Sequence, residues 1–391
     1  MTTVATNESE HLASWVSRLV QIPSVNPLHA GPRSGEPGEA RLAHALAGYF
    51  RDLGADSVEL VDVAEGRPNV YGIWEGTSDR WVVLDVHTDT VTVEHCEGDP
   101  FDGRIADGRV YGRGAVDTKA SLGVMMAVLE RARAEGRRPV PNLVVVGSIS
   151  EEAGGMLGAR GFRKWAEARG LRPNEVIVAE PTMCAPVHGH KGAVALEIRV
   201  LGEAAHSANP HLGRNAITGA AHLVLALEAE HQRLQSLTPS TEIGNGTLTV
   251  TMVNGGTGGN VVPDSCTLSV GRRIVPGESN QEVADRLCEL VRDECPLPVE
   301  FPLVYLGAPA FYQSPDSPLI GNLARWAGTQ PEVASYGTNA LRYSGFADEM
   351  VVFGPGSIDN AHTAVEFVEI EQLVRCAAVY SAWLGLGTDA R

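Results

Sequence analysis

Histidine and carboxylate side chains gather in five short segments, four of them where a predicted strand ends or in the loop after it. The segments read HTD, VDTK, SEE, AEP and AHT, and they contain His87 with Asp89, Asp117, Glu151 with Glu152, Glu180, and His362. In an open α/β sheet, ligands bind at the edge formed by the carboxyl ends of the strands. We therefore expect these side chains to converge on one site.

The adjacent carboxylates of Glu151 and Glu152 would repel each other at the end of a buried strand unless a cation lay between them. After them, the chain has no Lys or Arg until Arg160. A divalent metal would remove the repulsion. Two histidines and several carboxylates suit zinc, manganese or cobalt. So many ligands favour two metals about 3.5–4 Å apart, bridged by a carboxylate and a water.

Each segment also has an ordinary structural explanation. A single histidine after a strand is usually a surface or hydrogen-bonded residue. Asp117 could cap the helix that follows it, and Glu151 and Glu152 could simply favour a helix N-terminus. The combination of five such segments on one predicted edge is what favours a metal site.

The composition describes an ordinary globular protein and excludes some partners. The chain has 391 residues, of which 43% are hydrophobic and 20% charged, and a formal charge of −17. This acidity argues against nucleic acid or an anionic membrane as a partner. The start, MTTVATNESEHLASWV, lacks the pattern of a signal peptide, and no apolar run approaches the about 20 residues that span a bilayer. We expect a cytoplasmic protein whose six cysteines, none in a CxxC pair, stay reduced.

The order of predicted elements indicates an α/β fold with an inserted domain. Helical patterns and apolar strands alternate up to about residue 180, which predicts a mixed, mostly parallel sheet flanked by helices. Between 192 and 295 the pattern becomes strand, helix, strand, strand, helix, which is typical of an α+β sandwich. We predict one domain from 1–187 and 303–391 and an inserted domain from 188–302.

In sequence order, the five segments resemble the motifs of the M20 family of dinuclear-metal peptidases and deacylases. HTDTV resembles its HxD motif, GRGAVDTKAS its GRGxxDxKG motif and SEEAGG its EExG motif, with EPT and the later AH completing the set. The resemblance covers almost the whole chain. It implies a zinc-exopeptidase-like catalytic domain, an inserted lid or dimerisation domain and a homodimer.

The resemblance also implies a role for each of these residues. It places His87 and Glu180 on one metal, Glu152 and His362 on the other, and Asp117 as the bridge between them. Asp89 would orient the ring of His87. Glu151 would act as general base, taking a proton from the metal-bridging water that attacks an amide carbonyl.

Further residues follow from the resemblance in the inserted domain and beyond it. His206, in GEAAHSANP, would stabilise the oxyanion across the dimer interface. The predicted contacts with substrate are Asn260, Arg273, Thr338, Asn339 and Gly356. Because this chain reads GRR where the family often has DxR, either Arg272 or Arg273 could face the site.

The segments around EPT and GPGSIDNAH look most like the branch of acetylornithine deacetylase and succinyl-diaminopimelate desuccinylase. The expected reaction is removal of an acetyl or succinyl group from an amino acid, with two divalent metals, zinc first and cobalt or manganese as alternatives. A dipeptidase or carboxypeptidase using the same metals is the second reading. A third reading is a binding protein that has lost its activity. The presence of all five ligands together with Glu151 argues against it, because a degenerate enzyme would be expected to lose some of them.

Overall fold

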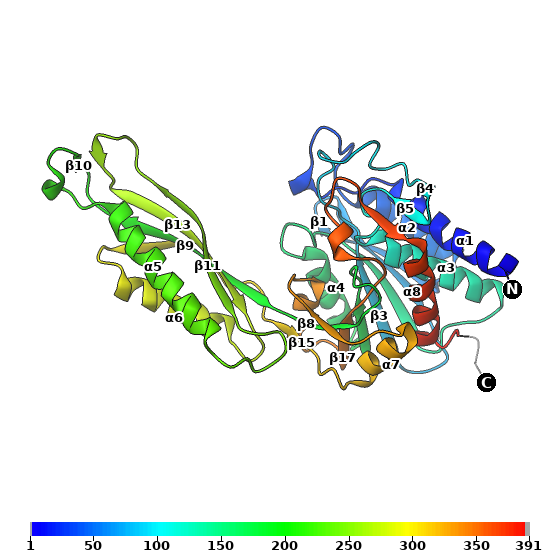
Figure 1. Cartoon of the computed structure of the whole chain (residues 1–391). Coiled ribbons are helices and arrows are strands. Elements are labelled where there is room, and N and C mark those ends of the chain that lie inside the picture. Colours follow the sequence, from blue (N-terminus) through cyan, green and yellow to red (C-terminus); the bar gives the residue numbers. More distant parts are fainter. Residues whose placement is uncertain (1, 388–391) are drawn as a thin grey trace. The chain divides into compact units, whose positions relative to one another are not determined.

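The chain folds into two units, which the computed structural model describes over residues 2–387 (Figure 1). The main unit comprises the residues up to His188, Gln313–Glu332 and the residues from Thr338 onward. The inserted unit comprises Gly189–Tyr312 and Val333–Gly337. Within the described residues, no helix is both long and apolar enough to cross a membrane.

Four parallel strands form the middle of a nine-stranded sheet: β6 (Asn142–Ser148), β3 (Trp81–His87), β7 (Glu175–Val178) and β17 (Glu349–Val352). Antiparallel strands extend it on both sides: β1 (Ser57–Ala64) and β2 (Arg67–Trp74) beyond β6, and β8 (Val187–His190) and β15 (Phe311–Tyr312) beyond β17. The short strand β16 (Glu332–Ala334) also pairs with β8. The predicted mixed, mostly parallel sheet is confirmed. Its central strands are almost wholly apolar because both faces are covered.

Helices cover both faces of this sheet (Figure 1). The larger hydrophobic core lies under the helices α1 (Thr2–Val20), α2 (Ala40–Asp52), α3 (Lys119–Ala134), α7 (Pro318–Ala327) and α8 (Ile370–Trp383). On the other face, α4 (Leu157–Glu167) packs Phe162 and Trp165 against Tyr71 of β2. Single-turn helices lie in the loops: η1 (Pro27–His29), η3 (Asn339–Arg342) and η4 (Ile358–Asn360).

A small three-stranded sheet joins two distant loops of the main unit. Its strands are β4 (Ile105–Ala106), β5 (Arg109–Tyr111) and β18 (Phe367–Glu369), in the order β18-β5-β4. The segment with Asp117 follows β5, and the segment with His362 precedes β18. Pairing of Phe367 with Tyr111 therefore brings these two segments together although some 250 residues separate them.

The inserted unit is an antiparallel sheet in the order β11-β13-β9-β14, with two helices on one face. Its elements are β9 (Gly192–Leu201), β10 (Ala205–His206), η2 (Pro210–Leu212), α5 (Ala216–Gln235), β11 (Thr247–Gly255), β12 (Val261–Val262), β13 (Ser265–Ile274), α6 (Asn280–Glu294) and β14 (Val299–Tyr305). The strand β14 was not predicted. Because it pairs with β9, the inserted unit extends beyond residue 302 to Tyr312.

Candidate metal centre

The predicted site residues of the main unit lie at the carboxyl edge of the parallel strands. His87 is the last residue of β3 and pairs with Ser148, the last residue of β6. Glu151 and Glu152 follow β6 directly, and Glu180 lies two residues after β7. Because these strands run parallel and in register, the residues that follow them meet at one edge.

Two overlapping groups of side chains have ligand atoms within 4.8 Å of one another. One contains His87, Asp117 and Glu152, and the other contains His87, Glu151 and Glu180. His87 is 3% exposed, and Asp117 and Glu180 are each 5% exposed. One imidazole and four carboxylates therefore converge, which is a donor set that zinc, cobalt or manganese accepts.

Asp117 lies between the two histidines. Its Oδ1 is 3.0 Å from His87 Nε2, and its Oδ2 is 3.1 Å from His362 Nε2. His362 Nε2 is also 3.1 Å from a carboxylate oxygen of Glu152. A carboxylate that presents one oxygen to each of two ligand groups is positioned to bridge two cations.

The ring of His87 is held so that Nε2 faces the cluster. Its Nδ1 lies 2.9 Å from the main-chain carbonyl oxygen of Asp89, to which it donates a hydrogen bond. The lone pair of Nε2 is then free to bind a metal. The Asp89 carboxylate lies farther from the ring, 3.7 Å from Nδ1, so the contact of Asp89 that holds the imidazole is the one from its carbonyl oxygen.

The carboxylate of Asp89 instead holds the loop that carries the two glutamates. It accepts the main-chain N–H groups of Glu151 at 3.0 Å and Glu152 at 3.1 Å. It also accepts the side-chain amide of Asn26 at 2.8 Å. Asp89 therefore positions the predicted general base with its carboxylate and the ring of His87 with its main-chain carbonyl oxygen.

Burial and mutual repulsion control the protonation of the cluster. Burial, assisted by neighbouring carboxylates, raises the pKa of Glu151 to about 8 and that of Glu180 well above its usual range. Burial opposes charge on His87 as well, but Asp117 outweighs it and raises the pKa of the imidazole. Without another cation, this cluster retains protons; a divalent ion would take their place.

Two residues at the cluster adopt the left-handed backbone conformation, which is uncommon for residues other than glycine. Ser150, next to Glu151, has φ of 62°, and His362 has φ of 61°. Such conformations persist where the surrounding structure demands them, often at functional sites. Here they direct Glu151 and the imidazole of His362 towards the cluster.

Gly356 approaches the loop of Asp117 closely. Its φ is 81°, and a Cβ at this position would lie 2.4 Å from Cγ2 of Val116. Any larger residue would therefore displace the loop that carries Asp117. This close packing is enough to explain why a glycine occupies position 356, without a contact to substrate.

The structure gives Thr338 and Asn339 a structural role in place of the predicted contact with substrate. Asn339 is 1% exposed, and its amide donates to Asp85 at 3.0 Å and to Ser148 at 3.1 Å. Thr338 is fully buried, and its hydroxyl accepts the main-chain N–H of Ala340. The polar sequence TN suggested a binding loop, but the amide nitrogen of Asn339 and the hydroxyl of Thr338 have partners within the protein.

The remaining predicted residues belong to the inserted unit. His206 and Asn260 are neighbours there: β10 pairs with β12, and Ser207 donates its N–H to the carbonyl oxygen of Asn260 at 2.9 Å. Both residues are exposed. Arg273 lies near the other end of β13, about 27 Å along the strand from Ser265. The structure thus brings His206 and Asn260 together and separates Arg273 from them.

The ambiguity between the two arginines is resolved within the inserted unit. Arg272 points to the helix-covered face, is 3% exposed and pairs with Glu278 at 2.5 Å. Arg273 points to the opposite, open face and is exposed. Arg273 is therefore the one available to a ligand.

Three residues around the cluster were missed from the sequence: Asn26, Arg113 and Glu366. Each is buried, and each holds a loop that carries a site residue. Their partners lie some 60 to 250 residues away in the sequence, so no local pattern indicates the contacts. The only signal was the presence of polar residues beside the motifs, as for Arg113 in GRGAVD.

Replacement of Asn26 tests the support of the glutamate loop. Its amide donates to Asp89 and, at 3.0 Å, to the carbonyl oxygen of Ala153. We expect Asn26→Ala to lower kcat about 10-fold or more and Asn26→Asp to lower it further, because a second carboxylate would repel Asp89. Steady-state rates at saturating metal measure both.

A matched control is available at the other edge of the sheet. The amide of Asn142, at the start of β6, holds the loop between β2 and β3 by donating to the carbonyl oxygens of Ser78 and Arg80. Asn142→Ala should cost stability but leave kcat unchanged. If Asn26→Asp were no worse than Asn26→Ala, the electrostatic explanation would be wrong.

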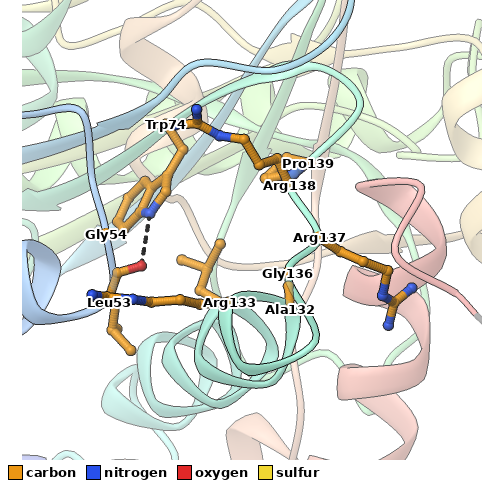
Figure 2. A pocket seen from close by; sticks show the side chains of 10 residues that line it. Leu53, Gly54, Trp74, Ala132, Arg133, Gly136, Arg137, Arg138 and Pro139 are labelled. Atoms are coloured by element: carbon orange, nitrogen blue, oxygen red, sulfur yellow. Dashed lines mark hydrogen bonds between the residues drawn. The ribbon is translucent and has the colours of Figure 1, made fainter.

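A cavity of about 300 Å³ lies away from the cluster and includes Trp74 and three arginines (Figure 2). Trp74 ends β2 beside the first residues of β6, so the cavity is at the edge opposite to the candidate metal centre. The guanidinium groups point in different directions and already have acceptors: Asp52 for Arg133, Leu386 for Arg137, and Asp56 for Arg138. They do not form an anion site.

Residues 83–385 match peptidase family M20/M25/M40. The chain belongs to this family. An acetylornithine deacetylase from Myxococcus xanthus is 33% identical over 339 residues, which cover 85% of this chain and 84% of the relative.

Solved structures support the same M20-family fold. A tripeptidase from Staphylococcus aureus aligns with a TM-score of 0.75 at 20% identity, covering 96% of this chain and 97% of that one. A dinuclear metal binding peptidase of the family from Bacillus subtilis aligns with a TM-score of 0.69 at 15% identity, covering 97% and 99%. This M20-family chain is therefore a hydrolase of linear amide bonds with a candidate dinuclear metal site.

Proposed function

We propose that the protein removes an acetyl or succinyl group from the amino nitrogen of an amino acid, as an acetylornithine deacetylase does. The observation that carries this proposal is the cluster itself, in which Glu151 lies beside the predicted ligands and is positioned by Asp89. The named relative from Myxococcus xanthus supports a deacylase over a peptidase.

Two divalent ions, zinc foremost and cobalt or manganese as alternatives, would polarise the scissile carbonyl and lower the pKa of water at the site. We assign one to His87, Asp117 and Glu180 and the other to Asp117, Glu152 and His362. His87 offers Nε2 because its Nδ1–H is engaged by the Asp89 carbonyl. Asp117 offers a different oxygen to each position.

Glu151 acts as the proton carrier. It accepts a proton from the water whose oxygen forms the new bond to the acyl carbon. It then donates that proton to the nitrogen as the carbon–nitrogen bond breaks, which gives a carboxylic acid and a free amine; the acid leaves as a carboxylate after losing its remaining proton to solvent. Burial makes this carboxylate a stronger base than an exposed one, which suits a group that must both accept and donate a proton.

We place His206 and Asn260 of the inserted unit beside the acyl group and Arg273 beside the substrate carboxylate. The protein would be a cytoplasmic homodimer in which each subunit supplies His206 to the other. The exposure of these three side chains and the proximity of His206 to Asn260 support this assignment. Gly356 would shape the pocket by allowing Val116 and the Asp117 loop to lie close.

Mixing two inactive variants tests His206. We expect His206→Ala to lower kcat about 10²–10³-fold, as loss of an oxyanion donor does. If His206 acts across the dimer, co-refolding His206→Ala with Glu151→Gln yields heterodimers with one intact site, and activity returns. If it acts within its own subunit, every site keeps one defect and no activity returns.

The substrate class is tested with metal-depleted protein, assayed before and after zinc, cobalt or manganese is added. The panel contains N-acetylornithine, succinyl-diaminopimelate, acetylmethionine and several dipeptides. Metal-dependent cleavage of an acyl amino acid supports the proposal. Cleavage of peptides alone would favour the second candidate, a dipeptidase or carboxypeptidase, which the structural likeness to a tripeptidase keeps open.

A further inference from the structure

A buried ion pair joins the two loops that carry Asp117 and His362. Arg113 Nη1 donates to Glu366 Oε2 at 2.6 Å, and the side chains are 3% and 1% exposed. We infer that Arg113 and Glu366 are positioning residues that set the affinity of the metal position shared by Asp117, Glu152 and His362. The inference rests on the proposed metal centre.

Glu366 holds the Asp117 loop through its second oxygen. Oε1 accepts the main-chain N–H of Val116 at 3.0 Å and that of Asp117 at 3.2 Å. The main chain of Glu366 adds a third contact, because its carbonyl oxygen accepts the N–H of Gly112 at 3.0 Å. One glutamate thus fixes the backbone on both sides of the turn that directs the Asp117 carboxylate into the cluster.

Arg113, which lies in the Asp117 loop, holds the His362 loop in turn. Its Nη2 donates to the carbonyl oxygen of Thr363 at 3.2 Å, one residue after His362. Its Nε donates to the carbonyl oxygen of Thr92 at 3.1 Å, in the loop after β3. The guanidinium fork therefore ties the segment after β5, which carries Arg113, to the segments that follow β3 and η4.

The pair is unnecessary for packing alone. Transfer of two charges from water to the interior is costly, and apolar residues of similar size often stabilise a fold as well or better. What apolar residues cannot do is accept two N–H groups and donate to two carbonyl oxygens at fixed positions. His362 adopts a left-handed conformation and its side chain is half exposed, so its own packing does little to hold it.

The contacts predict which metal position is affected more. Asp117 contributes to both positions, but the Arg113 contact to Thr363 affects only the loop of His362. His87 and Glu180, the remaining ligands of the other position, follow β3 and β7 and touch neither member of the pair. Weakening the pair should therefore loosen the His362 position more than the His87 position.

The test is calorimetric titration of metal-free protein with zinc, together with metal counts after dialysis. Glu366→Gln has the same shape but can satisfy only one of its two partners. Arg113→Lys keeps the charge but loses the fork that reaches Thr363 and Thr92. For both variants we expect one metal to bind within about 3-fold of wild type and the other to bind about 10- to 100-fold more weakly.

The control is Glu175→Gln. Glu175 begins β7, at the far end of the strand from Glu180, and pairs with Arg80 and the indole N–H of Trp383. This variant loses a partly buried ion pair yet should bind both metals as wild type does. A variant with lowered thermal stability but unchanged metal affinities would give the pair a purely structural role.

The outcomes separate the inference from the function on which it rests. If the wild-type protein bound fewer than two metals, the proposed dinuclear centre itself would be wrong. Wild type with two metals, and folded Glu366→Gln and Arg113→Lys proteins with two unchanged affinities, would overturn the positioning role alone. If Glu366→Gln does not fold, Arg113→Lys decides, since it retains the buried charge pair.

Discussion

Replacement of Glu151 by glutamine is expected to lower kcat about 10²–10⁴-fold, the contribution typical of a general base. Glutamine has the same shape but cannot accept a proton. Its main-chain N–H would still be held by Asp89, so the loop should keep its position. The variant should therefore bind substrate and both metals while losing turnover.

The number of metals that Glu151→Gln binds distinguishes a general base from a metal ligand. The geometry also allows Glu151 to join His87 and Glu180 as a ligand, because their atoms lie within 4.8 Å of one another. Glu152→Gln is the matched comparison, in which we expect one of two metals to be lost. A Glu151→Gln protein that binds one metal would make Glu151 a ligand and leave the reaction without its assigned base.

Removal of the metals is expected to abolish activity and to lower stability at neutral and alkaline pH. In the metal-free protein, burial raises the pKa of Glu151 to about 8, and hydrogen bonds to Asp117 and Glu152 raise that of His362 to about 10. At these two groups the folded state then holds more protons than the unfolded chain above about pH 4.5, first at Glu151 and then at His362. Its stability must fall as pH rises through this range.

Bound metal should cancel this loss, because it replaces the retained protons. At about 1,000 times the dissociation constant, a ligand that binds only the folded state adds about 4 kcal/mol. Thermal unfolding between pH 5 and 9, with chelator and with added zinc, measures both effects. A Tm that is equally insensitive to pH in the two conditions would show that the cluster is not a metal centre.

The parts of the site that the sequence revealed are those encoded by local pattern. Apolar runs that end in His87, Glu151 and Glu180 predict strands and place these residues on one edge, and the parallel register confirms that edge. His362 follows no such strand, so no strand pattern places it at this edge. Its place beside Glu152 depends on the pairing of β18 with β5, which no local pattern specifies.

What the sequence did not reveal is which atom of a residue is used. Asp89 was identified as part of the site, yet its carbonyl oxygen holds His87 and its carboxylate holds the following loop. Asn339 has a residue type suited to binding, but Asp85 and Ser148 occupy its amide. Such choices depend on contacts across the fold.

The division of the main unit into separate stretches of chain has a consequence for synthesis on the ribosome. The inserted unit is nearly continuous and can fold as soon as it emerges. The main unit cannot, because β17 joins β7 only after the insertion has been made. Roughly 180 residues separate Glu180 from His362, which is about 9–36 s of translation. During that interval the nascent chain carries an incomplete set of metal ligands, so the site can be assembled only after His362 has been made.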